Sequence, residues 1–137
     1  MQLKNTFVGH SGHVNSIAFS VKAAYLASGG KDGKAMLWNM NEGSHMKNFD
    51  VDCEINEVLF APKKFFLVIA TVNSLKVFDL VEETLIVDIK PTPIDPLLKE
   101  QKKPLSCLSV AWDKEGKYLY SGWSDNVVRV YEVVVKE

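Results

Sequence analysis

The stretch VNSIAFS at Val14–Ser20 recurs twice along the chain, as INEVLFA at Ile55–Ala61 and as CLSVAWD at Cys107–Asp113. In each copy apolar residues occupy alternate positions, which is the pattern of a half-buried β-strand. Each copy is followed by a second β-rich run, a turn, and a third run that ends in an aromatic and a polar residue. The chain therefore contains one supersecondary unit that is repeated three times.

The aromatic residues that end the third runs give the length of the repeat. Trp38, Phe78 and Tyr131 lie 40 and 53 residues apart, so the unit has about forty residues and carries one insertion. The insertion falls in KPTPIDPLLKEQKKP at residues 90–104, which is rich in proline and is predicted to be a loop. Within it, Asp95 is predicted to cap a short helix begun by Pro96. A repeat of this length is typical of a four-stranded propeller blade, so we expect an all-β fold of about three blades.

The composition indicates one soluble unit and disfavours several classes of function. The 137 residues carry a formal charge of −1, with Arg129 as the only arginine, so sequence-specific nucleic-acid binding is not expected. The longest apolar stretch, Phe65–Ala70, is too short to span a membrane, and the first residues, MQLKNTF, lack a signal-peptide core. We therefore expect a cytoplasmic protein, with Cys53 and Cys107 as reduced thiols that lack metal-ligand spacing.

Four residues of the first repeat have the spacing found in WD-repeat proteins. His10 stands four residues before Val14, Ser28 four before Asp32, and Asp32 six before Trp38. In that family the matching side chains form a hydrogen-bonded chain from the loop before the first strand to the third strand. The resemblance thus implies a structural tetrad of His10, Ser28, Asp32 and Trp38, whose buried polar groups would fix the register of the strands.

This tetrad is expected to be incomplete in the other two repeats. The third repeat keeps the spacing through Ser121, Asp125 and Tyr131, but Lys103 occupies the histidine position, so only a partial tetrad is implied. The second repeat has Val51 at the histidine position and is expected to rest on apolar packing.

Longer stretches resemble the family of the receptor for activated C kinase, a seven-bladed scaffold also described as a G-protein β-like subunit. The specific part is ASGGKDGKAMLW at residues 27–38, because generic WD repeats do not share its GGKDG turn. The similarity falls on the last three blades of that family. It implies a non-enzymatic interaction scaffold that links kinase signalling to the small ribosomal subunit and to translation, without a cofactor.

The same resemblance points to protein partners. The segment SLKVFDL at residues 74–80 corresponds to a strand associated with anchoring protein kinase C, which makes Ser74, Lys76 and Asp79 a candidate kinase-binding segment. The ribosome-facing basic loops of the family belong to its early blades, so we expect ribosome binding to need the full-length propeller. A G-protein β-like subunit or an adapter in another assembly remains an alternative, although no heptads for a coiled coil are present.

The resemblance also divides the chain into the parts of one partial propeller over residues 1–137. Residues 1–8 are expected to form the outer strand of a preceding blade, 9–50 and 51–89 two blades, 90–104 the inserted loop, and 105–137 a last blade without its outer strand. Three blades do not close a propeller. Either Leu3–Val8 of one copy pairs with Val127–Val135 of another in a homodimer, or the chain is part of a longer scaffold.

No catalytic or metal site is predicted. His10, Ser28 and Asp32 are the residue types of a nucleophilic relay, but the structural tetrad accounts for them and no Gly-x-Ser-x-Gly motif is present. The run Gly29–Lys34 has the wrong spacing for a phosphate-binding loop and is expected to be a hairpin turn.

The remaining histidines and the lysine pairs are expected to be solvated. His13 and His45 have no second ligand at a useful spacing. The lysines of two loops remain candidates for phosphate contacts, although a solvated loop is the favoured interpretation; these are Lys63, Lys64, Lys99, Lys102 and Lys103.

Overall fold

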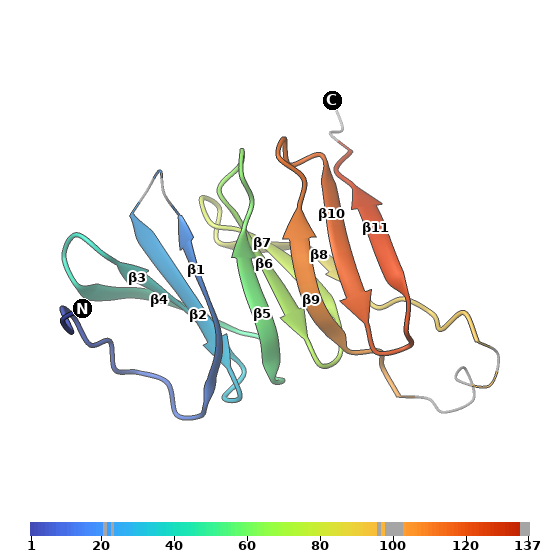
Figure 1. The fold of residues 1–137 in the computed structure, drawn as a ribbon, viewed down its shortest axis with the longest axis horizontal. Coiled ribbons are helices and arrows are strands. Elements are labelled where there is room, and N and C mark those ends of the chain that lie inside the picture. Colours follow the sequence, from blue (N-terminus) through green and yellow to red (C-terminus); the bar gives the residue numbers. More distant parts are fainter. Residues whose placement is uncertain (21, 23, 96, 98–102, 135–137) are drawn as a thin grey trace.

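The computed structural model describes residues 1–20, 22, 24–95, 97 and 103–134. Within these ranges the chain is all-β, and its eleven strands form three antiparallel sheets that stand side by side as blades (Figure 1). The prediction of an all-β partial propeller of about three blades is confirmed.

Each blade is a meander in which consecutive strands are neighbours. The first strands of the blades lie next to one another, since β1 contacts β5 and β5 contacts β9. Blade 1 consists of β1 (Val14–Ser20), β2 (Tyr25–Gly30), β3 (Lys34–Asn39) and β4 (Ser44–Asp50). Blade 2 consists of β5 (Ile55–Phe60), β6 (Phe66–Thr71), β7 (Leu75–Asp79) and β8 (Thr84–Ile89). Blade 3 consists of β9 (Cys107–Trp112), β10 (Tyr118–Trp123) and β11 (Val128–Glu132).

Turn residues connect the strands where the sequence predicts reversals. Gly33, in the turn between β2 and β3, has φ +76°, a conformation that glycine adopts without strain, and Asn126 takes the corresponding place in blade 3 with φ 67°. After the third strands of blades 1 and 2, the Oδ1 atoms of Asn39 and Asp79 accept the backbone N–H groups of the residues two and three positions further on. In these two blades the polar residue after the aromatic thus fixes the turn into the outer strand.

Blade 2 is buried on both faces, which explains its continuous apolar run. Along β6, Leu67 and Ile69 pack in the core shared with blade 1, while Val68 and Ala70 pack in the core shared with blade 3. All four side chains are fully buried. A strand enclosed on both faces is apolar throughout, as in other doubly covered sheets.

The two end blades each keep one open face. Val14, Ile17 and Phe19 of β1 are exposed, and at the other end Leu108, Tyr120 and Val130 of the neighbouring strands β9, β10 and β11 are exposed. Apolar side chains that gather in this way mark a surface that is suited to contact another protein.

The segment before β1 has no strand assignment in this chain. Instead, the ring of Phe7 packs against Trp38 with 5.2 Å between ring centroids. Pairing of Leu3–Val8 with a second copy therefore stays a prediction, and Val135 at the end of the proposed partner strand lies outside the described residues.

The inserted loop has no strand in its described part. Oδ1 of Asp95 accepts the N–H of Leu97 at 2.9 Å, which is the bond of a helix cap or an Asx-turn. Pro96, Lys99 and Lys102 lie outside the described residues, so the short helix and the phosphate contacts proposed there stay predictions. No helix in the described ranges has the length and apolar character needed to cross a membrane.

Candidate interaction site

The four side chains of the first tetrad form one hydrogen-bonded chain. Trp38 Nε1 donates to Ser28 Oγ at 2.9 Å, Ser28 Oγ lies 2.6 Å from His10 Nε2, and His10 Nδ1 lies 2.9 Å from Asp32 Oδ2. A proton on Nδ1 satisfies the whole chain, because Nδ1–H then donates to Asp32 and Nε2 accepts the Ser28 hydroxyl. The loop before β1 is thereby tied to β2, to the following turn and to β3.

Asp32 is the anionic end of this chain. Burial opposes its ionisation, but the bond from His10 and the backbone N–H groups of Ser11 and Lys34 outweigh that effect and hold the pKa of its carboxyl below the usual value. A charged carboxylate that accepts several N–H bonds is a strong acceptor, so Asp32 anchors both the loop and the turn.

Blade 3 satisfies its Ser and Asp with different residues. Asp125 forms a two-bond ion pair with Arg129 at 2.9 and 2.8 Å, and Trp123 Nε1 donates to Ser121 Oγ at 2.7 Å. The hydrogen bonds that Arg129 donates hold the pKa of the Asp125 carboxyl below its usual value. Among the described contacts Tyr131 makes no bond to Ser121, and burial raises the pKa of its phenol.

Sequence reasoning therefore missed Trp123 and Arg129. The available signal was that the only arginine of the chain stands four residues after Asp125. In blade 2, a hydroxyl pair replaces the aspartate turn: Thr71 Oγ1 accepts the N–H of Ser74 at 2.9 Å and lies 3.1 Å from its Oγ. Val51 is buried at the histidine position.

The candidate kinase-binding segment is mostly engaged within the fold. Ser74 is only 1% exposed, so its side chain is not accessible to a partner in this fold. Lys76 pairs with Asp88 at 3.1 Å, and Asp79 caps the turn after β7. The hydroxyl of Ser74 lies 3.1 Å from Thr71 Oγ1. The roles of Lys76 and Asp79 in kinase contact stay predictions.

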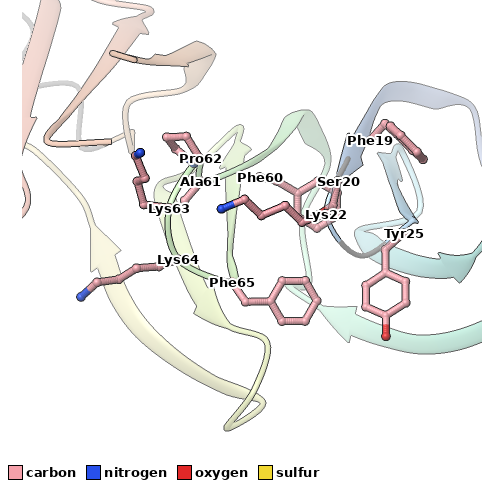
Figure 2. A pocket seen from close by; sticks show the side chains of 10 residues that line it. All are labelled: Phe19, Ser20, Lys22, Tyr25, Phe60, Ala61, Pro62, Lys63, Lys64 and Phe65. Carbon is pink, nitrogen blue, oxygen red and sulfur yellow. The ribbon is translucent and has the colours of Figure 1, made fainter. Parts of the chain in front are cut away.

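A groove of about 570 Å³ opens at one end of blades 1 and 2. Figure 2 shows the rings of Tyr25 and Phe65 beside each other in its lining, and their centroids are 5.5 Å apart. The ring of Phe60 stacks on that of Phe65. Lys22 and Lys63 flank the groove, and Lys63 lies 3.6 Å from Glu115 of blade 3. An exposed lysine in such an ion pair is readily available to a partner protein, because exposed ion pairs contribute little to the stability of the fold.

The geometry also explains why the His–Ser–Asp trio does not present a nucleophile. The residue Ser28 is 4% exposed, and its Oγ already accepts the Trp38 N–H, so no carbonyl has access to it. His45 bonds Asn48 and packs edge-on against Trp38. In the described ranges no group of three or more His, Cys, Asp or Glu side chains is arranged to hold a metal ion.

Comparison with known proteins adds three findings. The family model described as "WD domain, G-beta repeat" matches residues 1–39 and 97–132. The chain is 37% identical over 135 residues to "Small ribosomal subunit protein RACK1" of Caenorhabditis elegans, covering 98% of the chain and 41% of that protein. It is 35% identical over 132 residues to "Cross-pathway control WD-repeat protein 2" of Flammulina velutipes, covering 96% of the chain and 41% of that protein. The chain thus spans about two fifths of the length of both relatives.

Proposed function

The chain belongs to the WD domain, G-beta repeat family, and from this premise we propose that it acts as a protein-protein interaction scaffold of the receptor-for-activated-C-kinase type. One observation carries the proposal: the buried polar side chains of the blades form hydrogen bonds that hold the strands and turns together. The Ser28 hydroxyl and the Asp32 carboxylate serve the fold. Function is then left to loops and edges displayed on a rigid framework.

The finer role is to connect kinase signalling with the small ribosomal subunit in the cytoplasm. The 37% identity to a relative named as a small ribosomal subunit protein supports this role, and the resemblance of residues 74–80 supports a kinase contact. The near-neutral charge of the chain favours a docking role within a larger propeller over direct binding of ribosomal RNA.

Co-sedimentation with purified small ribosomal subunits over a salt series tests the ribosomal role. We expect a longer chain that supplies the remaining blades to sediment with the subunits, and this chain alone to stay in the supernatant at physiological salt. Failure of both to sediment contradicts the ribosomal role, and tight binding by this chain alone contradicts the requirement for further blades.

The kinase contact is tested with a matched pair of variants. Lys76→Ala and Asp88→Ala break the same ion pair, but only the first removes the lysine. If Lys76 contacts an activated protein kinase C, Lys76→Ala loses capture of the purified kinase and Asp88→Ala retains it. Equal capture by the two variants contradicts a direct role for Lys76.

The alternative, an adapter of another assembly, is supported by the relative named for cross-pathway control. If this alternative is right, the chain used as bait should capture neither purified small ribosomal subunits nor protein kinase C. The aromatic groove beside Lys63 is then the natural surface to alter first. A Phe65→Ala change would remove one of its walls.

We further propose that two copies close on each other when no other blades are present. Leu3–Val8 of one copy would pair with the unpaired outer edge of β11 in the other, which removes two exposed edges. The absolute mass in solution tests this closure. Two chains are expected for the full chain, and removal of residues 2–8 should give monomers or aggregates; an unchanged dimer without that segment refutes strand exchange.

A further inference from the structure

Adjacent blades are joined by side chains from the second and third residues of the inner strands β1 and β5. At the junction of blades 1 and 2, Asn15 Nδ2 donates to the backbone oxygen of Ile55 at 2.9 Å and to Glu54 Oε2 at 3.0 Å. Ser16 Oγ accepts the N–H of Val58 at 3.1 Å. The partners of Asn15 and Ser16 in β5 are thus the first and fourth residues of that strand.

The junction of blades 2 and 3 repeats this arrangement residue for residue. Asn56 Nδ2 donates to the backbone oxygen of Cys107 at 2.8 Å and lies 3.1 Å from Ser106 Oγ. Glu57 Oε1 accepts the N–H of Val110 at 3.0 Å. We call this pair of interactions the inner-strand latch: an amide donor at position two and an oxygen acceptor at position three, directed at positions one and four of the next inner strand.

A register irregularity places the donor. In β1 and β5 the pairing with the second strand skips the second residue, which is Asn15 in β1 and Asn56 in β5. The ladder of blade 3 skips Leu108 in the same way. A bulge re-aims the side chain of its extra residue, and in β1 and β5 this residue reaches the following blade. The same irregularity in β9 gives Leu108 the equivalent position.

The two open ends of the chain carry the two halves of an unmade latch. On β1, the carbonyl of Val14 and the N–H of Ile17 occupy positions one and four, and no side chain among the described residues bonds to either. On β9, Leu108 and Ser109 occupy positions two and three. Ser109 supplies the oxygen acceptor, but Leu108 has no donor.

We propose that the bare edge of β1 is a receptor for the inner strand of another blade, and that blade 3 of a second copy occupies it through half a latch. This inference rests on the two-copy closure proposed above and adds its inner contact. Ser109 of one copy accepts the N–H of Ile17 of the other, while the Val14 carbonyl stays without an amide donor. Apolar contact supports the same arrangement, since Ile17 is 66% and Leu108 53% exposed.

The proposal predicts that Leu108→Asn completes the latch. Sedimentation equilibrium of the full chain measures the dimer dissociation constant for Leu108→Asn and for its matched control Leu108→Ala, which removes the same apolar side chain without adding a donor. We expect the constant of the asparagine variant to be lower than that of the alanine variant by about tenfold or more, because the closed dimer gains one bond at each of its two equivalent junctions and each bond contributes about 1 kcal/mol. In the Leu108→Asn background, adding Ser109→Ala should raise the constant again. Leu108 and Ser109 are exposed, so neither change disturbs the core.

The outcomes separate this inference from the closure on which it rests. If the chains dimerise but Leu108→Asn is no tighter than Leu108→Ala, the latch is refuted and the closure stands. If every variant remains monomeric at all concentrations, a second copy is not the occupant and both proposals fail. The scaffold role is unaffected by either result, since it is tested by capture of ribosomal subunits and kinase.

Discussion

Replacing Ser28 with alanine tests whether the tetrad of blade 1 holds the fold. Its Oγ takes part in two hydrogen bonds, with His10 Nε2 at 2.6 Å and with Trp38 Nε1 at 2.9 Å. Each bond contributes about 1 kcal/mol, and the indole N–H left unpaired inside the blade adds about 1–2 kcal/mol, so we expect a loss of about 3 kcal/mol of unfolding free energy. Trp38 is 4% exposed, which leaves its N–H little access to water.

Urea unfolding followed by far-UV circular dichroism, at one fixed protein concentration, gives this free energy. Ser20→Ala is the matched control, because Ser20 lies half-buried on β1 and its hydroxyl makes no hydrogen bond among the described residues. A double-mutant cycle with Trp38→Phe isolates the orphaned N–H, which that variant lacks. The double variant should be more stable than the sum of the single losses predicts, by about 1 kcal/mol or more. A loss in Ser28→Ala no larger than in the control, or strict additivity in the cycle, would refute the account of the tetrad.

Three other predictions concern acid, thiol reactivity and blade 3. Folding lowers the pKa values of Asp32 and Asp125, so the two carboxylates stabilise the fold above about pH 4, and this contribution is lost as the pH falls through the lowered values. In urea titrations from about pH 6 to about pH 2, the unfolding free energy of Asp32→Asn should therefore fall less steeply than that of the parent chain. Burial raises the pKa of the Cys107 thiol to about 12, so iodoacetamide at pH 8 should label Cys53 first and should label both cysteines only in urea. Mass spectrometry of the peptides measures the labelling, and equal labelling of the two cysteines in the folded chain would contradict the burial of Cys107. Arg129→Lys retains the charge but loses the two-bond geometry to Asp125, so it should lower the unfolding free energy measured in urea by about 1 kcal/mol. An unchanged unfolding midpoint would mean that this geometry does not contribute to stability.

The strands and their order could be predicted from the sequence because their signals are local. Alternation of apolar residues marks β1, β5 and β9, and the Asp32-Gly33 pair marks a reversal whose Gly33 has positive φ. The aromatic that ends each third strand fixes the repeat length. The grouping into three blades followed from these local patterns alone.

The contacts between blades could not be predicted, because their partners are distant in sequence. A polar residue such as Asn15 in a half-buried strand has the pattern of a solvent-facing residue, yet its acceptor Ile55 lies forty residues away. The pair of Asp125 and Arg129 was missed for a different reason: the two residues stand only four apart, but arginine is a residue type outside the expected tetrad and takes over the role of the histidine. Likewise, the sequence pattern of β7 gave no measure of how deeply Ser74, the residue just before that strand, is buried.

The enclosed position of blade 2 sets the order in which the chain can mature as it is synthesised. Leu67 and Ile69 need blade 1 for their burial, whereas Val68 and Ala70 need side chains of blade 3 such as Cys107. Blade 1 carries its own polar tetrad and has all its strands once Asp50 has left the ribosome, but blade 2 stays half-covered until β9 has emerged more than fifty residues later. The nascent chain therefore displays an apolar sheet face for several seconds at usual rates of synthesis, the interval in which a chaperone has most to bind.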